Sequence, residues 1–194
     1  MLPSKKDLLL QAAKELFGQL GYTDTTFKKI STRAGVALGL LTHHYGNKEK
    51  LFLTAGLDVL DNFLQVLRES CARGTNGYES VKFFCQSYLE FSIDPTSNWL
   101  VLVRCSPYSD MKTTADRDTM VSEFAKVPQE LEREIQRGIN DGSIRKLPVR
   151  ETAQIILALM VGSNRTRTLT PYAPPRLYEE VLAFIERSIK AHTV

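Results

Sequence analysis

The segment from residue 26 to residue 50 combines cationic side chains, adjacent histidines and a glycine turn in a pattern suited to holding a polyanion. Thr26 can cap a short helix that ends at Gly35, and a second short helix fits residues 38–45. Gly35 permits the positive φ that a tight turn between the two helices needs. A helix-turn-helix of this kind normally places its second helix in the major groove of DNA.

The charge distribution favours the same partner. Residues 1–50 carry eight Lys or Arg and four Asp or Glu, whereas the remaining 144 residues carry 17 and 18. A basic N-terminal segment on a nearly neutral body indicates a polyanion partner at that end. The alternative is a solvated surface that happens to be basic, and charge alone does not separate the two.

Signals for catalysis are missing from the sequence. It has no phosphate-binding glycine loop, no nucleophile elbow and no metal motif at a recognisable spacing. His43 and His44 are adjacent, so a helix points them about 100° apart and they cannot ligate one metal ion from one face. Glu130, Glu132 and Glu134 are expected to be solvated. The sequence therefore predicts neither an enzyme nor a cofactor.

Length and composition limit the fold and the compartment. The 194 residues are 43% hydrophobic and 24% charged, as in a globular chain long enough to bury a core. The longest apolar run, residues 155–161, has seven residues, whereas a membrane helix needs about 20. Three widely spaced cysteines exclude a disulfide framework. We expect a cytoplasmic protein without a secretory signal and without a membrane partner.

Helical periodicity recurs along the whole chain, and no stretch alternates convincingly at period two, which predicts an all-α fold. Gly18 and Gly21 are expected to stop the first helix. Pro128 is expected to kink or split a long helix that ends near Ile139.

The last two predicted helices, residues 148–167 and 177–191, are amphipathic and are joined by a proline-rich loop. They could pair with their copies in a second chain as a four-helix interface. Alternatively, their apolar stripes face the core of their own chain. Both arrangements can hold, because Ile155, Leu159 and Leu182 leave apolar surface on other sides.

A set of residues in the first 55 positions or so occurs in order and without a gap: Gly21-Tyr22, Thr25-Thr26, Ile30, Ala34-Gly35-Val36, Gly39, Leu41, His44-Tyr45, Lys48-Glu49 and Leu51-Phe52. With these residues the segment resembles the tetracycline-repressor (TetR) family of bacterial transcriptional regulators. The segment Gly138–Arg145 resembles the end of the family's seventh helix. The resemblance implies an N-terminal three-helix DNA-binding domain with a helix-turn-helix, residues 1–50, and a larger helical ligand-binding and dimerisation domain, residues 51–194.

By the same resemblance, the chain is a ligand-responsive DNA-binding regulator, in this family most often a repressor. It would bind a palindromic double-stranded operator as a homodimer and be released by a small-molecule effector. One alternative is a helical small-molecule-binding protein or enzyme whose N-terminal hairpin is purely structural. A second alternative is a DNA-binding regulator that has no ligand and works through a partner protein.

The expected DNA contacts divide into phosphate and base contacts. His44 and Lys48 resemble the phosphate-gripping pair of the family, and apolar side chains in a major groove can meet thymine methyls. Leu40 is either a base contact or part of the core. Phosphate contacts are expected from Thr26, Lys28, Lys29, His44 and Lys48, and base contacts from Leu38, Leu40, Thr42 and His43, with Gly39 allowing close approach.

Two positions depart from the family pattern. Ala37 stands where the family usually has Ser or Thr, so the amides at the start of the recognition helix lose a side-chain cap. Thr42 stands where the family usually has Tyr, which leaves a shorter hydroxyl contact in place of a phenol.

The expected effector site is a mostly apolar cavity with few polar anchors. Arg104 would anchor an anionic ligand, or else pair with a carboxylate such as Glu90 or Asp94. The alternative is that the aromatic residues of this region are simply core. The candidate lining residues are Phe63, Tyr88, Phe91, Trp99, Arg104, Tyr108 and Phe124.

Overall fold

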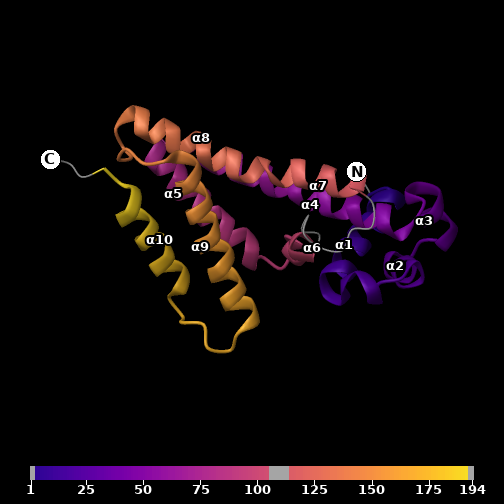
Figure 1. Ribbon diagram of the computed structural model, residues 1–194. Coiled ribbons are helices and arrows are strands. Elements are labelled where there is room, and N and C mark those ends of the chain that lie inside the picture. Colours follow the sequence, from indigo (N-terminus) through magenta and orange to yellow (C-terminus); the bar gives the residue numbers. More distant parts are fainter. Residues whose placement is uncertain (1–2, 105–113, 192–194) are drawn as a thin grey trace. The chain divides into compact units, whose positions relative to one another are not determined.

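The computed structural model describes residues 3–104 and 114–191, which form helices joined by short connections (Figure 1). Within these ranges the only strand-like feature is an isolated antiparallel bridge between Ile144 and Lys190. The all-α prediction is confirmed. The helices are α1 (Lys5–Asp24), α2 (Phe27–Ala34), α3 (Leu38–Tyr45), α4 (Lys48–Cys71), α5 (Gly77–Ile93), α6 (Trp99–Arg104), α7 (Thr114–Phe124), α8 (Lys126–Asp141), α9 (Val149–Leu169) and α10 (Leu177–Ile189).

The chain divides into two compact units. The first contains residues 1–62 and 94–124, and the second contains residues 63–93 and 125–194. This division differs from the predicted domain boundary at residue 50, because α6 and α7 belong to the same unit as α1–α3 and because α4 contributes residues to both units.

Helix α1 begins with a capping box, as the sequence predicts. The Ser4 hydroxyl accepts a hydrogen bond from the Asp7 amide at 3.2 Å, and the Asp7 carboxylate accepts one from the Ser4 amide at 3.0 Å. The prediction that Gly18 stops this helix is wrong, since the helix continues to Gly21, where a φ of +79° produces a kink.

Helix α6 packs on α1 in the first unit. A Cβ atom at Gly18 would lie 3.6 Å from side-chain atoms of Leu100 and Val101, which is an ordinary contact distance, so this position does not require glycine. Gly21 is constrained by its backbone, because a φ of +79° is rarely adopted by residues with a side chain.

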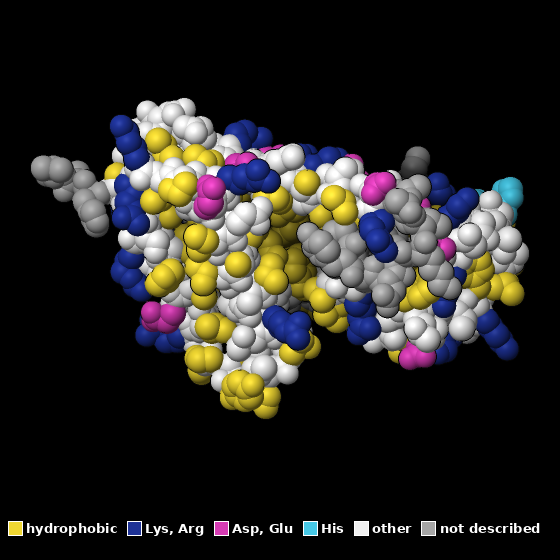
Figure 2. All heavy atoms as spheres, viewed as in Figure 1, with side chains coloured by type: hydrophobic (Ala, Val, Ile, Leu, Met, Phe, Trp, Pro, Cys, Tyr) yellow, Lys and Arg dark blue, Asp and Glu magenta, His cyan; other side chains and the backbone are white. Residues whose placement is uncertain are grey.

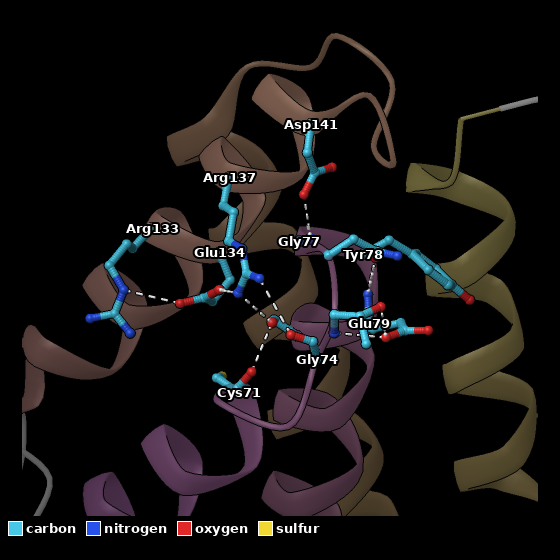
Figure 3. A network of polar contacts seen from close by, with 12 residues as sticks. Cys71, Gly74, Gly77, Tyr78, Glu79, Arg133, Glu134, Arg137 and Asp141 are labelled. Atoms are coloured by element: carbon cyan, nitrogen blue, oxygen red, sulfur yellow. Dashed lines mark hydrogen bonds and ion pairs between the residues drawn. The ribbon is translucent and has the colours of Figure 1, made fainter.

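Helices α5 and α8 of the second unit approach each other closely at two glycines. A Cβ atom at Gly77 would overlap the backbone nitrogen and Cα of Gly138. At the same end, the Asp141 carboxylate accepts a hydrogen bond from the Gly77 amide at 2.7 Å (Figure 3). Hydrogen bonds from Ser143 and from the Gly77 amide lower the pKa of Asp141, so this cap of α5 is charged at neutral pH.

Two glutamates of α8 are buried, Glu130 at 7% and Glu134 at 5% exposure. The Arg68 guanidinium donates to Glu130 at 2.5 Å. Arg133 lies 2.6 Å from Glu130. Arg133 also lies 3.0 Å from Glu134, and Arg137 lies 3.5 Å from Glu134 (Figure 3). The prediction that these two carboxylates are solvated is wrong. They are buried because arginines from α4 and α8 pair with them, which offsets the cost of removing a charge from water.

The long helix predicted across Pro128 is split into two helices, which is one of the two predicted effects of this proline. Helix α7 ends at Phe124 and α8 begins at Lys126. Pro128 therefore lies in the first turn of α8, where its missing N–H group costs no helical hydrogen bond.

The last two helices, α9 and α10, form a hairpin in the second unit (Figure 1). Met160 of α9 and Ile185 and Ile189 of α10 are buried in the unit. The chain is tied across the base of the hairpin by a hydrogen bond of 3.0 Å from the Arg145 amide to the Ile189 carbonyl. In the described ranges, no helix has both the length and the apolar character that crossing a membrane requires.

Candidate nucleic-acid interface

The turn between α2 and α3 is built from local signals. The Thr26 hydroxyl accepts a hydrogen bond from the Lys29 amide at 3.2 Å and so caps α2. Gly35 ends α2 in the left-handed conformation, with φ of +64°. The Val36 amide then donates to the Ser31 carbonyl at 3.1 Å, which closes the turn. These contacts make the predicted helix-turn-helix.

Helix α3 is fixed by its inner face. Ile30 of α2 and Leu41 of α3 are fully buried, and Tyr45 is 6% exposed. The Tyr45 hydroxyl donates to the Lys6 carbonyl of α1 at 3.0 Å. Because the helix is held by packing and by this bond, the residues on its other face have defined positions.

The outer face of α3 carries most of the predicted base contacts. Leu38 is 50% exposed, and Gly39, Thr42 and His43 are exposed as well. Leu40 is half-buried. Figure 2 shows histidine side chains, coloured cyan, on the molecular surface.

The start of α3 has no side-chain cap. Ala37 occupies the N-cap position and makes no capping hydrogen bond, as the sequence predicts. Leu38 and Gly39 follow directly, and both are exposed. The amides at this helix start are therefore open to an outside acceptor.

Helix α2 carries cationic side chains of its own. Lys28 is exposed, and the Lys29 ammonium donates to the Asp24 carbonyl at 2.8 Å. Arg33, which the sequence reasoning left out of the site, pairs with Glu15 at 2.7 Å. Its spacing of four residues from Lys29 could have revealed it, since residues four apart share a helix face. A shallow surface pocket of about 520 Å³ is lined by Leu16, Thr26, Lys28, Lys29, Thr32 and Arg33.

Lys48 has a structural role in the free protein. Its ammonium donates to the carbonyls of Tyr22 at 2.9 Å, Thr25 at 3.1 Å and Thr23 at 3.5 Å. It also lies 4.3 Å from the centre of the Tyr22 ring. The last turn of α1 has no basic residue of its own, so Lys48 supplies the cation that the negative end of the helix dipole attracts.

The residues predicted to line an effector cavity divide between the two units. In the second unit, the Phe63 ring lies 5.2 Å from the Tyr88 ring and 4.9 Å from the Phe91 ring, and all three are buried. Burial, with a smaller effect of Tyr178, raises the pKa of the Tyr88 phenol. These rings form a packed aromatic cluster.

The remaining predicted cavity residues belong to the first unit. Trp99 and Phe124 are half-buried, and Arg104 is exposed with its guanidinium against Gly21 of α1. The Asp94 carboxylate, a predicted partner of Arg104, accepts hydrogen bonds from the Thr96 amide and hydroxyl instead, at 2.8 and 2.7 Å. Tyr108 lies outside the described residues.

Two pockets of the second unit lie away from the aromatic cluster. One, of about 200 Å³, lies between α5 and α10. The other, of about 270 Å³, is a groove between α9 and α10 whose lining includes Ile155 and Phe184. These two side chains are 60% and 51% exposed, and Figure 2 shows hydrophobic side chains over the surface of this hairpin. Apolar surface of this kind is typical of a protein interface.

Known proteins match the chain at the level of sequence and of fold. The family model "Bacterial regulatory proteins, tetR family" matches residues 9–55. The HTH-type transcriptional regulator YhgD of Bacillus subtilis is 25% identical over 158 residues, which is 81% of each chain. The HTH-type transcriptional repressor AcnR of Corynebacterium efficiens is 25% identical over 190 residues, covering 94% of this chain and 90% of AcnR.

Two solved structures share the fold. A transcriptional regulator from Saccharomonospora viridis in complex with choline has a TM-score of 0.84 at 18% identity, covering 95% of this chain and 97% of that one. The regulator FadR from Bacillus subtilis in complex with stearoyl-CoA has a TM-score of 0.74 at 19% identity, covering 92% and 96%.

These matches favour a transcriptional regulator over the alternative of an enzyme with a structural hairpin. The family model covers the helix-turn-helix whose caps, turn and buried face are described above, and relatives of comparable length match along most of the chain. Residues 9–55 are similar to the TetR family of bacterial regulatory proteins, and the chain is similar along most of its length to two HTH-type transcriptional regulators.

Proposed function

We propose that this chain is a ligand-responsive repressor that binds an inverted-repeat DNA operator as a homodimer and is released from it by a small molecule. The observation that carries the proposal is the outer face of α3, which is held rigidly by Leu41 and Tyr45 and presents Leu38, Thr42 and His43 to solvent. A helix with a fixed inner face and a free outer face is the form in which major-groove readers are built.

Phosphate contacts flank this reading face. Thr26 caps the start of α2, and Lys28 and Lys29 of α2 and His44 of α3 are exposed. Cations and helix-start amides together neutralise phosphates and fix the register of the protein on the duplex. Lys48 would support DNA binding indirectly, by stabilising the end of α1, because its ammonium donates hydrogen bonds to three carbonyls there.

A second copy of the chain is expected to pack against the α9–α10 hairpin. Ile155 and Phe184 flank an apolar groove of about 270 Å³. Pairing of two such hairpins as a four-helix interface would bury this surface. Two recognition helices would then have to reach half-sites about 34–36 Å apart, or a multiple of that distance.

The effector is expected to act at the aromatic cluster of the second unit. Phe63, Tyr88 and Phe91 supply an apolar site, and the likeness to structures holding choline and stearoyl-CoA supports a small-molecule ligand. Helix α6 packs on α1 through Leu100 and Val101, so a change at α6 reaches the DNA-binding helices. A coupling of about 1–3 kcal/mol changes DNA affinity about 5–150-fold.

A duplex selected from a random pool is expected to contain an inverted repeat and to be bound by two copies of the chain. Lys28→Ala should reduce the magnitude of the slope of log K against log salt by about one per protomer, because each lost phosphate contact releases about one counterion fewer.

Lys48→Ala should weaken binding to every duplex without changing this slope. It should also lower Tm, because charged hydrogen bonds contribute about 1.5–3 kcal/mol to stability. Binding titrations at several salt concentrations measure the salt dependence of affinity, and thermal melts measure Tm. A lower slope with an unchanged Tm for Lys48→Ala would place Lys48 on phosphate instead, and failure to select any duplex would refute DNA binding.

An effector should change the fluorescence of Trp99, which is the single tryptophan of the sequence and lies at the start of α6. The same ligand should raise Tm through binding to the native state. It should release DNA over the same concentration range, because coupling between two sites is reciprocal. Choline and stearoyl-CoA are the first two probes, followed by a panel of small amphiphiles. A ligand that shifts Trp99 emission and Tm but leaves the DNA bound would contradict the coupling.

A further inference from the structure

The exposed face of α3 lacks the side chains that usually identify bases by paired hydrogen bonds. Guanine is most often read by Arg or Lys and adenine by Asn or Gln, yet α3 has the sequence LGLLTHHY and contains none of these residue types. On its exposed face, only the Thr42 hydroxyl and the His43 and His44 imidazoles can form hydrogen bonds. The remaining group on this face with a large side chain is Leu38.

Leu38 is the first residue of α3 and is 50% exposed. An exposed leucine alone needs no explanation, but two neighbours shape its surroundings. Gly39 has open space where a Cβ atom would lie, so nothing at that position keeps a duplex away from the helix. Thr42 follows four residues later on the same face, and its methyl group extends the apolar surface.

The charges of the helix-turn-helix favour a nucleic acid as the occupant. Lys28 and Lys29 are exposed on α2, and the amides at the start of α3 have no side-chain cap. The apolar group that a major groove offers is the C5 methyl of thymine. Leu40, the other candidate for such a contact, is half-buried and so is not available to the same extent.

We infer that Leu38 is a specificity-determining residue that recognises thymine through its C5 methyl group, with the Thr42 methyl beside it. The inference rests on the proposed function, since it assigns a base contact within that interface. It predicts that the operator half-site contains a thymine whose methyl group, rather than its hydrogen-bonding edge, is required.

Deoxyuridine provides the test, because it differs from thymidine only by this methyl group. In the selected duplex, each thymine is replaced by uracil at symmetric positions in both half-sites. Burying one methyl is worth about fourfold in affinity, so one symmetric pair should weaken binding about 15-fold. Leu38→Ala should lose most of the preference for the thymine duplex over the uracil duplex. Leu38→Met, which keeps a long apolar side chain, should retain most of the preference.

His43→Ala is the matched control, because it removes a neighbouring side chain of the same face without removing apolar contact from Leu38. It should weaken binding yet keep the preference for thymine over uracil. Thermal melts of all variants should match the parent protein, because both side chains are exposed. If no thymine is sensitive to uracil, or if Leu38→Ala retains the parent's ratio, the inference is wrong while the proposed function stands. If the parent protein retains no duplex, the proposed function fails together with the inference.

Discussion

Replacing Phe184 by Asp is expected to convert the dimer into a folded monomer and to weaken operator binding by more than about 100-fold. Phe184 is 51% exposed at the groove between α9 and α10, so a monomer tolerates a charge there. In a dimer the carboxylate would be buried without a partner, which costs several kcal/mol, and every 1.4 kcal/mol is tenfold in an equilibrium constant. Sedimentation velocity reports the oligomeric state, and titration of the selected duplex reports affinity.

Substitution of the neighbouring residue, Ile185, is expected to have a different effect from substitution of Phe184. Ile185 is 4% exposed and packs inside its own unit, so Ile185→Asp should unfold the protein rather than divide the dimer. Tyr172→Asp is the matched control, because Tyr172 is an aromatic residue with 78% exposure in the loop before α10. This variant should remain dimeric. A Phe184→Asp protein that stays dimeric at micromolar concentration would show that the interface lies elsewhere.

Replacing Gly77 by Ala is expected to cost about 3 kcal/mol or more of unfolding free energy. The new Cβ atom would overlap the backbone of Gly138, and a backbone cannot rotate away as a side chain can. Overpacking of a core typically costs about 1–3 kcal/mol and occasionally more. Helices α5 and α8 would have to separate, which would also strain the cap that Asp141 provides to Gly77. For a chain of this size the loss corresponds to roughly 6–12 °C in Tm.

Gly162→Ala is the control for this substitution. Gly162 lies in α9 of the same unit, and a Cβ atom there would meet nothing within 4 Å. An alanine in an exposed helix interior should stabilise the protein by about 0.5–1 kcal/mol, because it restricts the unfolded chain. Denaturant unfolding of both variants measures the difference in their unfolding free energies, and the oligomeric state is checked in parallel. Equal stability of Gly77→Ala and the parent protein would contradict the close crossing of α5 and α8.

The sequence by itself determined the elements whose causes are local. The caps at Ser4 and Thr26 and the glycine turn at Gly35 depend on residues within a few positions of one another, and each is formed in the structure. The buried face of Leu41 and Tyr45 follows from helical periodicity in the same way. The reading face of α3 was predictable for this reason, apart from the choice between Leu38 and Leu40.

Only the tertiary structure decided which partner each side chain meets. Helix α6 packs on α1 beside Gly18, and Lys48 meets carbonyls that lie 23 to 26 residues away in the sequence. Glu134 is buried, and Ile185 is covered while Phe184 is not. A helical repeat specifies which residues share a face, but the helix that covers the face depends on packing between distant segments. The same physical reason explains why the helix-turn-helix could be derived from its own residues, whereas the roles of Lys48 and Gly77 could not.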